Sequence, residues 1–283
     1  MSTIPRFTAG LLAGVSLIAL ALFSGCGGKD TQSLNFGGST TVLPIMESAI
    51  EEYEKLHPEL TLSYEAQGSS VGIKGVMEGT IALGASSRNL RDSEKEAGVM
   101  ATPIALDGVA VIVNDRVTID NLSLAQAARI FSGEINNWSQ VGGPDAKIII
   151  INRDEASGTR ETFLETCLKP GAGEKAVFYR GAIIVESNGD MVQKVGATPY
   201  AVGYCGFGYI QNARQAGGKE LSVGGATPTV RNVLNKSYPL QRELYVVHQG
   251  PLKEETPEKK FVDYLLSRDG QKIVKDQKFI PLR

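Results

Sequence analysis

The chain has 283 residues, of which 42% are hydrophobic and 21% charged, a composition typical of a globular protein with one or two domains. Its formal net charge of −2 excludes the broad basic surface that nucleic-acid-binding proteins use. Three cysteines are too few for a disulfide scaffold, and neither the cysteines nor the two histidines have metal-binding spacing. We therefore expect no metal ion, no cofactor and no nucleic-acid partner.

The N-terminus has the pattern of an export signal. Arg6 precedes an apolar stretch of about a dozen residues, too short to span a bilayer comfortably. The small residues before Cys26 resemble a bacterial lipobox, in which the cysteine is lipidated and becomes the mature N-terminus. We expect a signal peptide over residues 1–25, a flexible tether over residues 26–34 and a lipid anchor at Cys26. The alternative is an ordinary secretory peptide that leaves this cysteine free. In both cases the mature chain works outside the cytoplasm, in the periplasm or on the cell surface.

Strand and helix patterns alternate along the mature chain. Short apolar or alternating runs predict strands at residues 34–37, 60–64, 81–84, 104–113, 147–152, 183–185, 201–209 and 240–247. Apolar residues at helical spacing predict helices at residues 44–58, 71–79, 124–131, 160–168, 191–199 and 258–266, with another near 270–275. Pro44 suits the first turn of its helix, and the run at 104–113 is apolar enough for a strand buried on both faces. This alternation predicts an α/β architecture with largely parallel sheets.

A short Gly/Ser/Thr loop follows several of the predicted strands and precedes a helix. The loops are GSTT from Gly38, GSS from Gly68, SSR from Ser86, SGT from Ser157 and, more weakly, SNG from Ser187. For any single loop, simple helix capping explains the pattern, because Ser, Thr and Asn accept hydrogen bonds from the first N–H groups of a helix. Several such loops at the carboxyl ends of sheet strands predict a local anion site made of free N–H and O–H donors.

Charged residues beside these loops extend the predicted site. Arg88 and Arg153 adjoin the loops, and a guanidinium can bind two oxygens of one anion; a surface ion pair is the alternative for each. We expect Arg160 to be an ordinary solvated residue. Asp154 and Glu155 are candidates to accept the proton of a protonated oxyanion such as phosphate and to repel sulfate, which has no proton. Charges on a loop surface are the alternative for these two.

Six motifs, taken in order, resemble the phosphate-binding proteins of bacterial phosphate ABC importers. They are GSTTVLPIME, GSSVGIKGVMEG, GASSRNL, IALDGVAVIVN, IFSGEINNWSQVGG and INRDEASGTRETF. Each motif is weak alone, but their order and spacing are specific, and the resemblance extends over residues 35–283.

The resemblance implies a periplasmic-binding-protein fold of type II. In this fold, two α/β lobes with mostly parallel sheets flanked by helices are joined by two crossover strands. Here the crossovers correspond to residues 104–113 and 240–247. The first lobe would combine residues 35–113 with 240–283, and the second lobe would span residues 114–239.

The resemblance also implies which residues hold phosphate in a cleft between the lobes. The positions that match the family's ligands are Ser39, Thr40, Thr41, Ser69, Arg153, Ser157, Gly158 and Thr159. Ser87 stands where some members have an Asp that accepts the phosphate proton, and Arg88 follows it. We include Ser87 and Arg88 among the expected ligands, and keep Glu155 and Asp154 as possible proton acceptors.

The function expected from this resemblance is capture of inorganic phosphate and its delivery to the permease subunits of an ABC importer, by a monomeric, membrane-anchored binding protein. Two alternatives stay open: binding of another oxyanion, sulfate or molybdate, and a surface lipoprotein that senses phosphate. An enzyme is not expected, because the sequence has neither an Asp/His two-metal pattern nor a GxSxG motif. The sequence also leaves open whether Cys167 and Cys205 form a disulfide.

Overall fold

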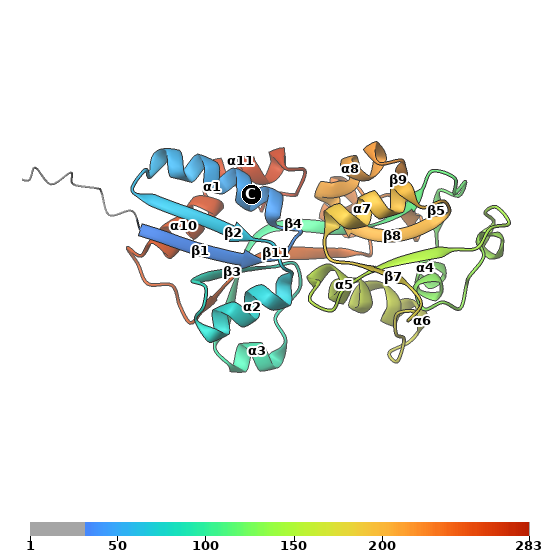
Figure 1. Cartoon of the computed structure of the whole chain (residues 1–283), viewed down its shortest axis with the longest axis horizontal. Coiled ribbons are helices and arrows are strands. Elements are labelled where there is room, and N and C mark those ends of the chain that lie inside the picture. Colours follow the sequence, from blue (N-terminus) through green and yellow to red (C-terminus); the bar gives the residue numbers. More distant parts are fainter. Residues whose placement is uncertain (1–31, 283) are drawn as a thin grey trace, which may run out of the picture. The chain divides into compact units, whose positions relative to one another are not determined.

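The computed structural model describes residues 32–282, which belong to one compact unit of strands and helices (Figure 1). The strands are β1 (Gln32–Gly38), β2 (Leu60–Glu65), β3 (Leu83–Ser86), β4 (Val99–Asn114), β5 (Asn121–Leu122), β6 (Ile149–Arg153), β7 (Ile183–Val185), β8 (Ala201–Gly206), β9 (Gly218–Glu220), β10 (Ser222–Val223) and β11 (Gln241–Gln249). The longer helices are α1 (Leu43–Leu56), α2 (Ser69–Glu78), α4 (Leu124–Phe131), α7 (Asn188–Ala197), α10 (Pro257–Leu266) and α11 (Arg268–Asp276). The shorter helical segments are α3 (Asp92–Glu96), η1 (Trp138–Val141), α5 (Gly158–Phe163), η2 (Leu164–Leu168), α6 (Lys169–Ala172), η3 (Phe207–Tyr209), α8 (Ile210–Gln215) and α9 (Val230–Leu234).

Strands of the main sheet follow the order β2-β1-β3-β11-β4-β8-β6-β7, with β9 paired beside β4. At one end β1 pairs in parallel with β2 and β3, and at the other end β6 pairs in parallel with β7 and β8. Between these groups, β4 and β11 run antiparallel to each other and to their other neighbours. The predicted α/β fold is confirmed, and the two parallel groups belong to one continuous hydrogen-bonded series.

Two large hydrophobic cores, apart from a small third cluster around Ile73 and Val247, show that the fold has two lobes. One core is made of buried side chains from residues 34–105 and 244–279, and we call the structure around it the first lobe. The other core is made of buried side chains from residues 109–240 together with Ile280, and we call the structure around it the second lobe. The exact lobe boundaries that the sequence suggests stay a prediction.

Two long strands connect the lobes, as Figure 1 shows for β4 and β11. The first part of β4 pairs with β11, and its last part, from Val109, pairs with β8 and β9. The C-terminal tail adds a third connection that the sequence did not predict. Leu106 and Ile280 exchange two main-chain hydrogen bonds of 2.8 and 3.0 Å, so the tail reaches from α11 to the second core.

Most predicted elements are present with slightly different ends. Helix α1 begins with Pro44 in its first turn and buries Ile45 and Ala49 on its apolar face, as expected. The strand predicted for residues 201–209 is wrong in its last three residues, since β8 ends at Gly206 and η3 follows. There the main-chain N–H of Phe207 donates to the Asp107 carboxylate at 3.0 Å rather than to a neighbouring strand. Helices α3, α8 and α9, of five or six residues, were missed because so short a segment sets no apolar period.

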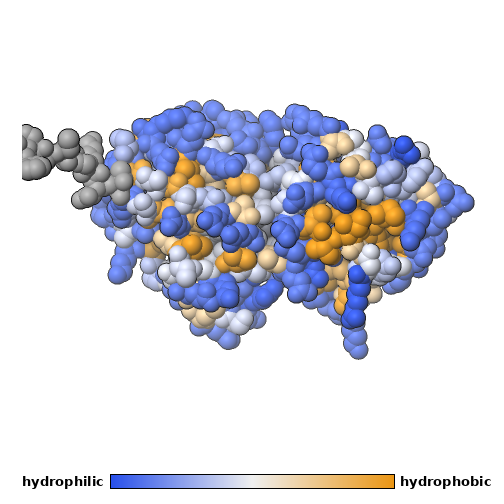
Figure 2. Space-filling view, in the orientation of Figure 1, coloured by the Kyte–Doolittle hydropathy of each residue, from blue (hydrophilic) through white to orange (hydrophobic). Residues whose placement is uncertain are grey.

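Strand β7 forms one edge of the main sheet and carries apolar side chains that face solvent. Ile183 and Ile184 are exposed, as are Val177 and Tyr179 just before them. Figure 2 shows continuous hydrophobic surface over the region where β7 lies in Figure 1. Single exposed apolar residues are common in proteins, but here several adjoin along one edge.

Cys167 and Cys205, whose pairing the sequence left open, are both free thiols in the structure. Both side chains are fully buried, and this burial raises the pKa of each thiol. A buried thiol with a raised pKa is a poor nucleophile, so both cysteines act as core residues.

Several expectations concern the N-terminal segment. The predicted signal peptide and the predicted lipid anchor at Cys26 lie outside the described residues. Gln32 and Ser33, which were expected in the tether, are part of β1 and lie opposite Leu60 and Thr61 of β2. Within residues 32–282, no helix combines the length and hydrophobicity needed to cross a membrane.

Candidate functional site

Five Ser/Thr-containing loops follow β1, β2, β3, β6 and β7, at the carboxyl ends of these strands. Two of the serines are helix caps: Ser157 Oγ accepts from the N–H of Arg160, and Ser187 Oγ accepts from the N–H of Asp190. The starts of α1 and α2 have no side-chain cap. Simple capping therefore explains two of the loops, and it leaves the hydroxyls at the starts of α1 and α2 to other partners.

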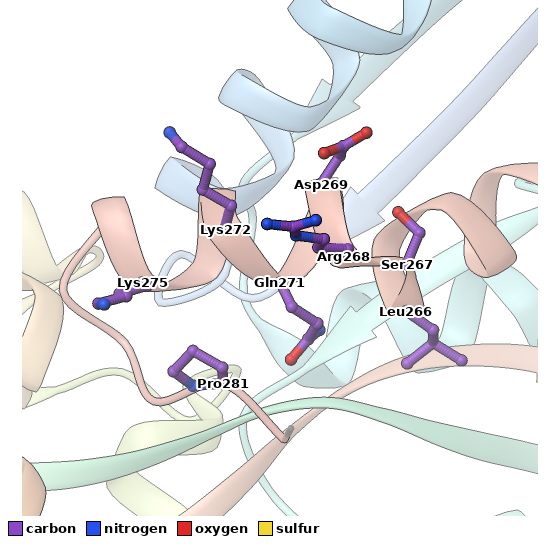
Figure 3. A pocket seen from close by; sticks show the side chains of 8 residues that line it. All are labelled: Leu266, Ser267, Arg268, Asp269, Gln271, Lys272, Lys275 and Pro281. Carbon is purple, nitrogen blue, oxygen red and sulfur yellow. The ribbon is translucent and has the colours of Figure 1, made fainter.

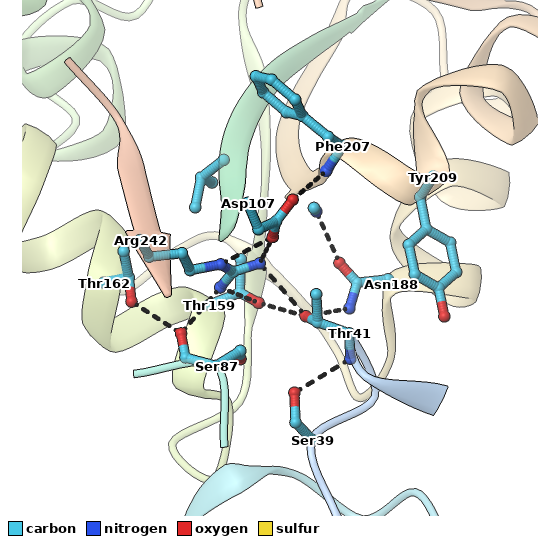
Figure 4. Close-up of polar contacts among 12 residues, drawn as sticks. Ser39, Thr41, Ser87, Asp107, Thr159, Thr162, Asn188, Phe207, Tyr209 and Arg242 are labelled. Carbon is cyan, nitrogen blue, oxygen red and sulfur yellow. Dashed lines mark hydrogen bonds and ion pairs between the residues drawn. The ribbon is translucent and has the colours of Figure 1, made fainter. Parts of the chain in front are cut away.

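Most of the predicted ligands lie in one buried polar cluster. The side chains that are at most 4% exposed include those of Ser39, Thr40, Thr41, Ser69, Ser87, Arg153, Ser157 and Thr159. Direct contacts join loops that are far apart in sequence. Thr41 Oγ1 lies 2.9 Å from Thr159 Oγ1, as Figure 4 shows, and Ser69 Oγ lies 3.3 Å from Ser87 Oγ. The loops thus converge, through a contact between the lobes at Thr41 and Thr159 and a contact within the first lobe at Ser69 and Ser87.

Gly158 lies where the loops of the two lobes touch. A Cβ atom at this position would be 2.2 Å from Ser69 Oγ and 2.8 Å from Ser87 Oγ, closer than real Cβ atoms approach other atoms. Next to it, the N–H of Ser70 donates to the carbonyl of Ala156 at 3.1 Å. Only glycine fits between these loops without moving them apart.

Arg153 is the charged residue at the centre of the predicted site. Its side chain is buried, and Nη2 donates to the Glu186 carbonyl at 2.7 Å and to Thr40 Oγ1 at 3.3 Å. Its Nε and Nη1 atoms are also buried and have no hydrogen-bond partner among residues 32–282. Burial lowers the pKa of this guanidinium, yet an arginine stays charged at neutral pH. Three buried N–H groups of one cation therefore point to an anionic ligand.

Asn188 orders the hydroxyls of the first loop, although the sequence indicated only a weak loop around it. Its Nδ2 donates to Thr40 Oγ1 and to Thr41 Oγ1, each at 3.0 Å, and its Oδ1 accepts from the N–H of Gly206. Thr40 Oγ1 thus accepts from both Asn188 and Arg153, which occupies its two lone pairs and leaves its hydrogen to be donated. An asparagine directly after a serine at the start of a predicted helix, as in Ser187-Asn188, is the sequence signal that could have identified this residue.

Comparison with known proteins shows to which family this chain belongs. Residues 27–269 match the model of the PBP superfamily domain. The phosphate-binding protein PstS of Borreliella burgdorferi is 35% identical over 272 residues, which cover 95% of this chain and 97% of that protein. The chain belongs to the bacterial phosphate-binding proteins.

Two further members of the family extend this comparison. Phosphate-binding protein PstS of Bacillus subtilis is 33% identical over 264 residues, covering 90% of this chain and 82% of that protein. A crystal structure of a phosphate ABC transporter substrate-binding protein with bound phosphate, from Clostridium perfringens, is 34% identical and superposes with a TM-score of 0.81. That superposition covers 89% of this chain and 100% of the other chain.

In this phosphate-binding protein, Arg88 is held by carboxylates rather than directed into the cluster. Its two terminal nitrogens donate to the two oxygens of Glu94 at 2.7 and 2.8 Å, and its Nε lies 3.1 Å from Glu161 Oε2. Burial acts to raise the pKa of Glu94, but the hydrogen bonds from Arg88 lower it below its usual value. Arg91 also binds Glu161 through two nitrogens, at 2.5 and 3.1 Å. The structure therefore places Arg88 in an ion-pair network that connects the first lobe to Glu161 of the second lobe.

The two candidate proton acceptors differ in their surroundings. Glu155 is exposed, whereas Asp154 is half-buried. One carboxylate oxygen of Asp154 is buried and has no hydrogen-bond donor in the described part of the chain. Burial raises the pKa of Asp154, an effect that the neighbouring Arg153 partly offsets. Of the two, only Asp154 has an oxygen that would gain from a new donor.

A pocket on the first lobe lies away from the polar cluster. Figure 3 shows a pocket of about 710 Å³ beside α11, lined by Arg268, Lys272, Lys275 and neighbouring residues. None of the predicted ligands lines this pocket. Across residues 32–282, no group of three or more His, Cys, Asp or Glu side chains is placed to hold a metal ion. The polar cluster itself consists mainly of buried hydroxyl groups and the Arg153 guanidinium, whose Nε and Nη1 have no partner among residues 32–282.

Proposed function

We propose that this protein binds inorganic phosphate in the polar cluster between its lobes and delivers it to the permease of an ABC importer. The observation that carries this proposal is the buried guanidinium of Arg153, whose Nε and Nη1 have no partner among the described residues. The hydroxyls of Thr40, Thr41 and Thr159 lie around this region. Relatives that match nearly the whole chain are named for phosphate binding, and a related crystal structure holds phosphate.

The proposed ligands are the residues that the resemblance suggests, with the exception of Arg88. They are the side chains or main-chain N–H groups of Ser39, Thr40, Thr41, Ser69, Ser87, Arg153, Ser157, Gly158 and Thr159. Arg88 is left out, because Glu94 and Glu161 hold its guanidinium. The buried charged residues near the cluster are Arg88, Arg153, Arg242, Glu94 and Asp107, three positive and two negative, and their sum of +1 favours a bound anion.

The proposal has parts that concern the whole molecule. We propose that the protein is exported, anchored through a lipid on Cys26, monomeric and without enzymatic activity. The relatives are binding proteins of a transport system, which supports a binding role. The named relatives and the phosphate-bound structure favour phosphate over sulfate or molybdate, and transport over sensing alone.

Calorimetry on the purified protein, first stripped of bound anions, tests this function. We expect one phosphate ion per chain, and we expect sulfate and molybdate to displace it poorly. Binding of sulfate as tightly as phosphate, or no heat on adding phosphate, would contradict the proposal. Hydrolysis of a chromogenic phosphate ester would contradict the absence of enzymatic activity.

Replacing Asp154 by asparagine is expected to reduce discrimination against sulfate. A carboxylate oxygen that accepts the phosphate proton repels an anion without a proton, whereas an amide does not carry that negative charge. We expect the ratio of sulfate to phosphate dissociation constants to fall by roughly tenfold, the size of one charged hydrogen bond. Competition titrations measure this ratio, with Glu155→Gln as the control on the exposed neighbour. An unchanged ratio in Asp154→Asn would exclude Asp154 as the proton acceptor.

A further inference from the structure

A buried ion pair lies beside the proposed phosphate ligands, and the ligand assignment does not use it. Asp107 of β4 and Arg242 of β11 stand opposite each other in the antiparallel ladder. The Asp107 side chain is completely buried, and its Oδ2 accepts from Nε and Nη2 of Arg242 at 2.9 and 2.8 Å. Its other oxygen accepts from the N–H of Phe207 at 3.0 Å. Both oxygens are thus engaged, and the carboxylate fixes the plane of the guanidinium.

Every N–H group of Arg242 has an acceptor, and these acceptors lie in both lobes. Beyond the two hydrogens that Nε and Nη2 donate to Asp107, Nη1 donates to the Ser87 carbonyl at 3.1 Å and to Thr159 Oγ1 at 2.9 Å. Nη2 also donates to Thr41 Oγ1 at 3.3 Å. A guanidinium has five N–H groups, and the five bonds to Asp107, Ser87, Thr159 and Thr41 use all of them. Figure 4 shows this guanidinium between the loops of the two lobes. Arg242 therefore has no N–H group left for a ligand of its own.

The hydrogen bonds to Thr41 determine where its own hydrogen points. A threonine oxygen has two lone pairs and one hydrogen. In Thr41 the two lone pairs accept from Arg242 and from Asn188 Nδ2. The contact of 2.9 Å with Thr159 Oγ1 must then use the hydrogen of Thr41. Thr41 is the donor in this contact, and Thr159 is the acceptor.

The same count of lone pairs and hydrogens applies to the hydroxyl of Thr159. Its oxygen accepts from Arg242 Nη1 and from the Thr41 hydroxyl, which occupies both lone pairs. The hydrogen of Thr159 is therefore free to be donated, and it has no assigned acceptor within the described part of the chain. Thr159 is one of the proposed phosphate ligands. Because both lone pairs are occupied, the Thr159 hydroxyl can bind an anion only by donating its hydrogen.

We propose that Arg242, oriented by Asp107, is a positioning residue that fixes the Thr41 and Thr159 hydroxyls as a one-way chain of donors ending at the phosphate. This inference rests on the proposed function, because it needs phosphate as the final acceptor. It changes the role of Thr41 from a direct ligand to an indirect one, since its hydroxyl hydrogen is used on Thr159. Arg242 acts through these hydroxyls and does not touch the anion.

A double-mutant cycle on phosphate affinity tests this chain. We expect Thr159→Val to weaken phosphate binding by about tenfold, because the last donor is lost. We expect Arg242→Lys to weaken it as well, because an ammonium group cannot hold Asp107, Thr41 and Thr159 together. In the double variant the two effects should not multiply, because Arg242 acts through the hydroxyl that is already missing. Effects that multiply would overturn the inference, since a merely structural arginine affects affinity independently of Thr159.

A second cycle covers the case in which Arg242→Lys does not fold. Thr41→Val and Thr159→Val both leave the Asp107–Arg242 pair in place. We expect Thr41→Val alone to weaken binding and to add little to Thr159→Val. If the wild-type protein binds phosphate but the effects of Thr41→Val and Thr159→Val multiply, the donor chain is overturned and the proposed function is not. A wild-type protein that does not bind phosphate would overturn the proposed function and the inference with it.

Discussion

Replacing Arg153 by alanine is expected to weaken phosphate binding by roughly 100- to 1,000-fold. The side chain is buried, and its Nε and Nη1 have no acceptor among residues 32–282, so a bound anion would take charge-assisted hydrogen bonds from them. Two such bonds at about 1.5–3 kcal/mol each correspond to at least this change in the dissociation constant. Isothermal titration with phosphate measures it.

Arg160→Ala is the matched control for this prediction. Arg160 is on the same loop-helix segment, but its guanidinium lies over the Phe178 ring, 4.8 Å from the ring centre. We expect its removal to cost little stability and to leave phosphate affinity within about twofold. An Arg153→Ala protein with wild-type affinity would remove this residue from the site and with it the main support for the proposed function.

Gly158→Ala is expected to lower phosphate affinity by roughly 10- to 100-fold while the protein stays folded. The new methyl group would meet Ser69 Oγ at 2.2 Å and Ser87 Oγ at 2.8 Å, so the loops of the two lobes must separate to admit it. Overpacking of this kind costs about 1–3 kcal/mol, and here the cost falls on the state in which the lobes touch. Each lobe on its own has no such conflict, since Gly158 starts α5 with ordinary backbone angles. Small-angle X-ray scattering with phosphate present should show a more open molecule.

Gly189→Ala provides the control for the added methyl group. Gly189 lies in the first turn of α7, beside the same cluster, and a Cβ there would meet only Ser187 Oγ at an ordinary 3.5 Å. We expect this variant to bind phosphate like the wild type. If both glycine variants weaken binding equally, backbone flexibility rather than contact between the lobes explains the effect.

The fold could be predicted from the sequence because its signals are local. Alternating strand and helix patterns, a Pro at the start of α1 and an apolar run in β4 each depend on neighbouring residues. The elements that were missed have other causes. Short helices such as α9 set no period, and η3 forms because Phe207 bonds to Asp107, 100 residues away. The pairing of the tail with Leu106 is equally non-local.

The candidate site could be predicted only for residues whose local sequence motif also determines where they lie in the fold. The Ser/Thr loops share one pattern, and the structure brings most of them together. Arg88 has the same local context as a ligand, but its environment depends on Glu94 in the next helix and on Glu161 in the other lobe. Asp107 and Arg242 are 135 residues apart, and no local rule pairs them. A charged residue within an apolar strand, as at Asp107 in β4, is a signal that could have marked this position; Arg242, between Gln241 and Glu243, has no such signal.

The tail that joins Leu106 to Ile280 has a practical consequence for observing this protein at work. Three chain segments, β4, β11 and the tail, connect the two lobes, and the N–H of Leu282 near the end of the tail donates to Gln271 Oε1 of α11 at 2.7 Å. We expect any swing of one lobe against the other to turn about these three segments, so a fluorophore fused after residue 282 should travel little. Dye pairs placed on β2 and β7, at the two far edges of the sheet, would report the swing with the longest lever arm.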